Sequence, residues 1–364
     1  MFRTRCNFLS ATALAAMSLL CAAPLAHAQS REYTLGSEGG TARNWTGASP
    51  QVEGPDAMVI DARRALADDD PAAARRLLDE YIKNNDRRDN PRLAEALLLR
   101  GDALVALDFE YKALYDYERV AKEFPQTEEF KIAIERELRI GLEYLGGLKR
   151  RVFGIRFADG EEIGIELLIR VQERLPGDEI AEEAAIKLAD HYYGKRELRL
   201  ARDAYELYLA NYPEGPNRVH AERRLIDANV ARFKGPEYDG GGLIDARVRI
   251  RSFARRYPVE AERNGLNEGM IARIDESLAA QLLVAAEWYE VKDDPAAERY
   301  TLERLVDRYP RTLSAARAMD LLVAKGWWDE DDAAARTAEP DTVIIGPTDA
   351  EVVTPEDGPA EDDR

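Results

Sequence analysis

The chain has 364 residues, of which 45% are hydrophobic and 33% charged, so it holds enough apolar material for an extended core. Its net charge of −18 argues against a nucleic acid partner, because phosphate binding needs a basic surface. Both cysteines lie in the first 28 residues, which excludes a disulfide framework and thiolate chemistry in the rest of the chain.

Residues 1–28 have the pattern of a secretory signal peptide. Arg3 and Arg5 form a basic start before an apolar run, and Ala26-His27-Ala28 is a small-x-small cleavage site before Gln29. We therefore expect the chain to be exported and residues 1–28 to be removed, rather than retained as a membrane anchor.

Cys21 raises the alternative of a lipoprotein, in which a cysteine becomes the first mature residue and carries a lipid. A small residue normally precedes such a cysteine, and here that position is Leu20. Lipidation of Cys21 is therefore not expected.

Composition divides the remaining chain into three parts. Residues 29–55 are rich in Gly, Ser, Thr and Pro without a period, as in a flexible linker. Residues 56–328 show apolar residues at three- and four-residue steps, which predicts helices almost throughout. Residues 329–364 contain thirteen acidic and two basic residues, so we expect an acidic disordered tail.

One helical pattern recurs within residues 56–328 and closes each time on an apolar residue followed by proline. Counting back from the proline, apolar or small residues stand at offsets that keep them on one helical face. The copies are residues 113–125, 164–176, 201–213, 246–258 and 298–310, with a weaker one around Ala74, Leu78 and Tyr81. This period predicts an all-α, tetratricopeptide (TPR)-like α-solenoid of about six helix-turn-helix units.

Each of these helices is preceded by a partner helix with a small residue at the expected crossing point. The clearest are Gly101, Gly141, Ala189 and the pair Ala285-Ala286. A small residue lets two helix backbones approach closely, while large side chains fill the neighbouring layer. We therefore expect the two helices of each unit to cross at these positions.

Two spacings between copies are longer than a simple turn requires, at residues 145–163 and 232–245. The first insertion is both basic and apolar, with candidate partner-binding residues Arg150, Arg151, Phe153 and Arg156. Insertions of this kind project from solenoids as loops. A loop that packs on its own chain, with solvated arginines, is the alternative.

No catalytic arrangement is evident. Only His191 and His220 follow the signal segment, and neither lies in a metal-spaced cluster. Gly240-Gly241-Gly242 lacks the strand and the further glycine that nucleotide binding requires. We therefore predict a protein that is not an enzyme and that has no cofactor and no metal site.

Binding is then expected from shape. In a TPR array the first helix of each pair lines a groove, and its positions here combine carboxylates with apolar residues, as suits an extended or helical peptide with aromatic side chains. The groove candidates are Glu95, Leu98, Asp102, Val105, Leu138, Leu142, Leu145, Ile186, Asp190 and Tyr193, with Glu135 and Glu183 at its edge. The alternative is that about half of the apolar positions belong to the core between units.

The segment 180–213, IAEEAAIKLADHYYGKRELRLARDAYELYLANYP, resembles a repeat of the BamD family. These are TPR proteins of the outer-membrane β-barrel assembly machine. The resemblance lies in Pro176-Gly177-Asp178, in Leu188-Ala189-x-x-Tyr192-Tyr193, and in Ala201-x-x-x-Tyr205 followed by Tyr212-Pro213. It covers most of residues 56–325 as architecture, but only this unit is close in detail.

The resemblance implies a periplasm-facing scaffold, peripheral to the outer membrane, that engages the barrel-assembly pore subunit and C-terminal peptides of unfolded outer-membrane proteins. The chain departs from the family in the poor lipidation site, the 145–163 insertion, the acidic tail and a count of six units instead of five. An adaptor of cell-wall or Tol–Pal coordination, with the same helical pattern, remains the alternative. A secreted regulator of an enzyme is a third possibility.

Overall fold

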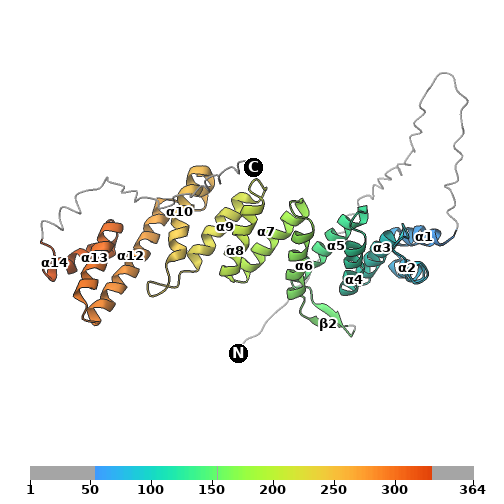
Figure 1. Ribbon diagram of the computed structural model, residues 1–364, viewed down its shortest axis with the longest axis horizontal. Coiled ribbons are helices and arrows are strands. Elements are labelled where there is room, and N and C mark those ends of the chain that lie inside the picture. The colour runs from blue at the N-terminus through green and yellow to red at the C-terminus, as the bar shows by residue number, and fades with distance from the viewer. Residues whose placement is uncertain (1–53, 154, 330–364) are drawn as a thin grey trace, which may run out of the picture. The chain divides into compact units, whose positions relative to one another are not determined.

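A computed structural model describes residues 54–153 and 155–329 of the chain. The expected signal segment 1–28, with Cys21, lies outside these residues, and so do nearly all of the expected linker and tail. Fourteen helices and one two-stranded antiparallel hairpin make up the secondary structure of the described residues (Figure 1).

The elements follow one another along the chain with short connections. The bounds are α1 Pro55–Ala67, α2 Pro71–Asn85, α3 Leu93–Ala106, α4 Glu110–Glu123, α5 Glu128–Leu145, β1 Arg150–Val152, β2 Ile155–Ala158, α6 Glu161–Arg174, α7 Glu179–Gly194, α8 Leu198–Asn211, α9 Arg218–Ala231, α10 Gly241–Arg256, α11 Pro258–Arg263, α12 Glu268–Val291, α13 Pro295–Arg308 and α14 Leu313–Ala324.

The long helices form six antiparallel pairs, as the repeat pattern predicted. The pairs are α1/α2, α3/α4, α5/α6, α7/α8, α9/α10 and α12/α13, and each helix packs on the next along the chain. The short α11 lies between the fifth and sixth pairs, and α14 packs on α12 and α13. The TPR-like α-solenoid is therefore confirmed for the part of the chain that the structure describes.

The closing prolines stop the second helix of a pair with one backbone geometry. The residues at the ends of α4, α6, α8, α10 and α13 all have φ between −135° and −126° and ψ between 48° and 65°. A residue before proline is excluded from the helical region by the proline ring, so the helix must end there. The repeated apolar-Pro dipeptide is thus a stop signal that repeats the same turn.

Both predicted glycines lie against large side chains of the partner helix, and at Gly141 the backbone of α6 also lies close. A Cβ built on Gly101 would lie 2.3 Å from the ring of Tyr117, and one on Gly141 would lie 2.6 Å from Cδ1 of Leu168. Both large side chains, and Tyr205 in the fourth pair, are fully buried. Trp327 and Trp328 pack partly buried against the last core cluster, beside α14.

The second insertion is held against the following pair. The side-chain amide of Gln281, on α12, donates a hydrogen bond of 2.6 Å to the carbonyl of Tyr238. Gly240 lies so close to Gln281 and Leu278 that a Cβ would meet atoms at 2.6 and 2.9 Å. This loop is therefore packed on its own chain.

We expect Gly101→Ala to destabilise the protein, although alanine is the better helix former. The added methyl group would enter the space of a buried ring whose hydroxyl is also fixed by Asp102, and such overpacking costs about 1–3 kcal/mol against a propensity gain of about 1 kcal/mol. Urea unfolding checks this. Gly194→Ala is the matched control, because nothing lies within 4 Å of its Cβ position. Equal stability of the two variants would contradict the crossing.

Candidate functional site

Most of the predicted apolar groove residues lie in or against the core. Leu98, Leu138 and Ile186 are 7%, 3% and 4% exposed and belong to the buried clusters. The half-buried candidates that pack against the same clusters are Val105, Leu142, Leu145 and Tyr193. The structure therefore favours the alternative in which these apolar positions serve the contacts between helices.

Asp102 lies in a polar joint between two units. Its Oδ1 accepts a hydrogen bond of 2.8 Å from the hydroxyl of Tyr117, on the second helix of its own pair. The same atom accepts one of 2.9 Å from Nε of Arg136, on the first helix of the next pair. One carboxylate thus links three consecutive helices.

Asp190 repeats this arrangement two units further on. It accepts a hydrogen bond of 2.6 Å from the hydroxyl of Tyr205, which again lies fifteen residues later in the chain. It also pairs at 2.7 Å with Nε2 of His220 on α9. Burial acts to raise the pKa of Asp190, but the hydrogen bonds from His220 and Tyr205 outweigh it and hold this pKa below its usual value. Asp102 and Asp190 therefore have a structural role at the joints.

The other predicted carboxylates differ in whether they form ion pairs. Glu95 pairs with Arg63 and, at 3.0 Å, with Arg92, and Glu135 pairs at 3.3 Å with Arg139. Glu183 is exposed. The bases that complete the joints were missed by the sequence reasoning, although each follows its acid by 30 to 34 residues, about one repeat.

An open acidic pocket of about 540 Å³ lies between α7 and the start of α9. Its lining residues are Glu179, Glu182, Glu183, Ile186, Lys187, Asp190, Pro216, Asn217 and His220. Glu182 is fixed by the Tyr208 hydroxyl at 2.6 Å, while Glu179 and Glu183 are turned to solvent. This pocket brings together three of the predicted groove residues: Glu183, Ile186 and Asp190.

The chemistry of the pocket follows from its charge. Four carboxylates face one lysine and one histidine, so the local potential favours a cationic guest. Carboxylates of this kind also accept hydrogen bonds from the N–H groups of an extended chain. The arrangement is suited to binding a cationic segment.

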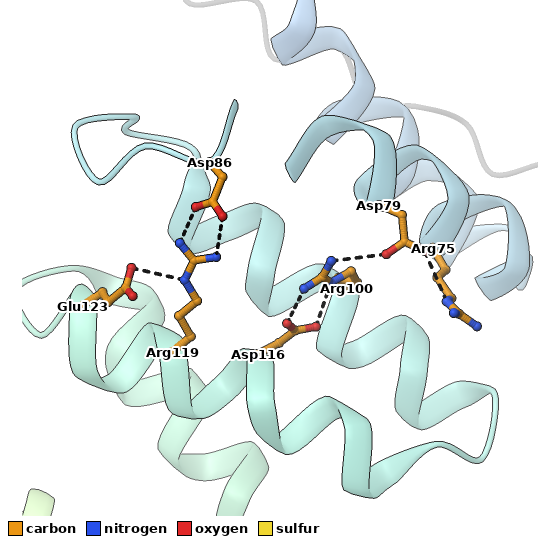
Figure 2. Close-up of polar contacts among 7 residues, drawn as sticks. All are labelled: Arg75, Asp79, Asp86, Arg100, Asp116, Arg119 and Glu123. Carbon is orange, nitrogen blue, oxygen red and sulfur yellow. Dashed lines mark hydrogen bonds and ion pairs between the residues drawn. The ribbon is translucent and has the colours of Figure 1, made fainter. Parts of the chain in front are cut away.

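A second set of charged contacts joins α2 to both helices of the next pair, α3 and α4. Arg100 on α3 bonds Asp116 of α4 at 2.5 and 2.9 Å and Asp79 of α2 at 3.2 Å (Figure 2). Arg119 on α4 reaches back to Asp86, at the end of α2, and also contacts Glu123 at 3.2 Å (Figure 2). These contacts fix the register of neighbouring units.

A buried network of the same kind connects α4, α5 and α6. Arg174 contacts Glu118 at 2.6 Å and the fully buried Glu137 at 2.7 Å. Burial raises the pKa of Glu137 to about 7, against the effect of Arg174. Burial also acts to raise the pKa of Glu118, but hydrogen bonds from Arg174 and Lys122 outweigh it and lower this pKa to about 2. Periodicity gave no sign of this network.

The candidate partner loop forms the hairpin β1–β2 and divides into two kinds of side chain. Arg150, Arg151 and Arg156 lie against α4 and the turn before it, whereas Phe153 is 97% exposed. The arginines are therefore taken up by contacts within the chain, and the apolar residue faces outward.

Tyr205→Phe should lower the free energy of unfolding by about 1 kcal/mol near neutral pH, because Asp190 loses a hydrogen-bond donor. Since the pKa of Asp190 is lowered in the folded state, the carboxylate stabilises the fold above its unfolded pKa. That stability is lost as the pH falls through the folded pKa, so the difference between the two proteins should shrink in acid. Urea unfolding at several pH values measures it. Tyr115→Phe, at a 65% exposed tyrosine, should change little.

Glu137→Gln should show the opposite pH dependence. A carboxyl whose folded pKa is raised to about 7 destabilises the fold as it ionises, so wild type should lose stability relative to the variant between about pH 5 and pH 8. We expect the free energy of unfolding of the wild type to fall by about 1 kcal/mol or more relative to that of the variant. Urea unfolding at several pH values measures this difference. A flat difference across this range would mean that Arg174 keeps Glu137 ionised throughout.

Within residues 54–153 and 155–329, no group of three or more His, Cys, Asp or Glu side chains is placed to hold a metal ion. The helices from α1 to α14 also include none that is long and apolar enough to cross a membrane.

Comparison with known proteins finds similarity to one family over residues 163–338. Solved structures that resemble the chain include the C-terminal part of a TPR repeat-containing protein from Cytophaga hutchinsonii, with 14% identity, coverage of 74% of this chain and 88% of that chain, and a TM-score of 0.36. A MamA RS-1 double mutant has 18% identity, coverage of 56% and 95%, and a TM-score of 0.30. No curated protein sequence matches. A family model described as "YfiO: Outer membrane lipoprotein" matches residues 163–338, so the expected similarity to the YfiO (BamD) family is confirmed over these residues.

Proposed function

We propose that the protein is an exported, non-catalytic scaffold of outer-membrane β-barrel assembly that works at the periplasmic face of the outer membrane. The family match over residues 163–338 supports the outer-membrane role, and the six-unit array supports binding of protein segments. The partners we propose are the barrel-assembly pore subunit and C-terminal segments of unfolded outer-membrane proteins.

The acidic pocket between α7 and α9 is the observation that carries this proposal. It lies within the family-matched part of the chain and contains carboxylates, such as Glu179 and Glu183, that are not used in a joint. Its volume of about 540 Å³ admits a few residues of an extended segment. The pocket is therefore the proposed point of contact with an unfolded client.

The charge of the pocket restricts how such a client binds. A terminal carboxylate would be repelled by the four acidic side chains, so a C-terminal segment would place its free end outside and a Lys or Arg side chain inside. Exposed carboxylates act over a short range in salt, so this selection should weaken as ionic strength rises.

Glu179→Lys combined with Glu183→Lys should weaken binding of a labelled peptide of alternating aromatic and basic residues by at least tenfold. Both side chains are solvent-facing, so the fold should persist, unlike after charge reversal at Asp102 or Asp190. Fluorescence anisotropy at low and high salt measures the affinity. Glu173→Lys, an exposed acid on α6 outside the pocket, is the matched control. Unchanged binding in the double variant would remove the pocket from the proposal.

Affinity purification of the full chain from gently solubilised envelopes tests the cellular role. Recovery of the barrel-assembly pore subunit, reduced in the double-lysine variant, is the expected result. Recovery of peptidoglycan-binding or Tol–Pal proteins in its place would assign the chain to envelope coordination.

A further inference from the structure

The hairpin β1–β2, inserted between α5 and α6, presents an apolar face to solvent. Ile155 and Phe157 are 66% and 63% exposed, and between them Arg156 points the other way, as alternation along a strand requires. Phe153, at the turn, is 97% exposed. In Figure 1 the hairpin projects from the neighbouring helices beside the start of α6.

Its inner face fixes the hairpin to the preceding unit. Arg156 contacts Glu110 at 2.6 Å and Asp108 at 3.0 Å. The guanidinium of Arg150 lies 4.8 Å from the ring of Tyr111, a cation–π contact. A hairpin of two short strands is marginal by itself, so these contacts decide its position. These contacts therefore keep the apolar face of the hairpin directed toward solvent.

Phe153 combines an unusual backbone conformation with an exposed side chain. Its backbone has φ of 50°, a region that bulky side chains rarely adopt and where Asn or Gly is usual in hairpin turns. The side chain has almost no contact with the rest of the protein. An unfavourable backbone combined with a fully exposed aromatic ring indicates a ligand outside the chain.

We propose that this hairpin inserts Phe153, Ile155 and Phe157 into the interface of an anionic lipid bilayer. This inference rests on the proposed location of the protein at the face of a membrane, and it adds a site of attachment to that membrane. Lys112, Lys149 and the three hairpin arginines outnumber Asp108, Glu110 and Asp159, with which some of them pair, so the base of the hairpin carries an excess of positive charge in a chain of net charge −18. Cationic and aromatic residues together favour a negatively charged membrane surface.

The size of the patch favours lipid over a protein partner. A specific protein interface takes about 20–30 residues on each side, whereas this face consists of three outward side chains on two short strands. Insertion of a few apolar side chains into the headgroup region needs no complementary shape. Such a contact is weak and reversible, as suits a peripheral protein.

The test is cosedimentation of the full chain with phosphatidylcholine vesicles that contain or lack phosphatidylglycerol. All proteins carry Cys21→Ser, so that no lipid can be attached there. We compare the triple variant F153S/I155S/F157S with V259S/V291S, which removes two exposed valines elsewhere. Circular dichroism and thermal unfolding confirm that each variant is folded. Phe153→Trp reports insertion by a blue shift in the difference between its fluorescence and that of the parent, which has four tryptophans of its own.

We expect the chain to bind the anionic vesicles, the triple variant to bind at least tenfold more weakly, and the valine variant to bind as the parent does. Equal vesicle binding by the triple variant, or a Phe153→Trp variant whose fluorescence does not shift on adding vesicles, would overturn the proposal. The proposal would also fail if the chain bound no vesicles while the triple variant no longer captured a protein that copurifies with the parent, since the hairpin would then be a protein contact. The triple variant should keep its peptide affinity, which separates this proposal from that of the acidic pocket.

Discussion

The close approach of the two helices in each pair is the constraint on which the other features depend. Gly101 leaves room for the ring of Tyr117, whereas Gly141 lets the backbones of α5 and α6 approach closely beside Leu168. Each pair buries its apolar face only against its neighbours, so an error at one crossing displaces the surfaces offered to the next unit. The polar joints and the acidic pocket both lie on surfaces positioned in this way.

The joints show how charge serves the array without a large gain in stability. Asp102 and Asp190 each receive a tyrosine hydroxyl and a base from the next unit, so the carboxylate is satisfied although it is partly buried. Partly exposed ion pairs contribute little free energy, and their geometry is more informative than their strength. They set which face of one unit meets the next. Asp190 also lines the acidic pocket, so one carboxylate belongs both to the site and to the joint between two units.

Much of the fold could be predicted from the sequence because the signals were local. Small residues at helix crossings and apolar-Pro dipeptides at helix ends act within one unit, and both are present where they were expected. The role of the carboxylates was harder to foresee. Periodicity assigns Asp102 to a helix face, but whether that face meets solvent or Arg136 depends on the geometry between units.

The same limit explains the buried charge network and the hairpin. Glu137 has the sequence context of a solvated helix residue, and only the packing of α4 and α6 around it removes it from water. The insertion 145–163 was recognisable as extra, yet its division into inward arginines and outward apolar residues depends on strand register. Register fixes which side chains share a face, and a short strand offers too little alternation to reveal it.

The attachment of the hairpin has a mechanical consequence. It is covalently part of the α5/α6 pair, but Arg156 holds it to Glu110 at the start of α4, so it braces two units across the joint at Asp102. A force applied at the tip would be divided between both units and would act on that joint before any other. The pairs from α7 onward would receive the same force only through the packing of α7 on α5 and α6.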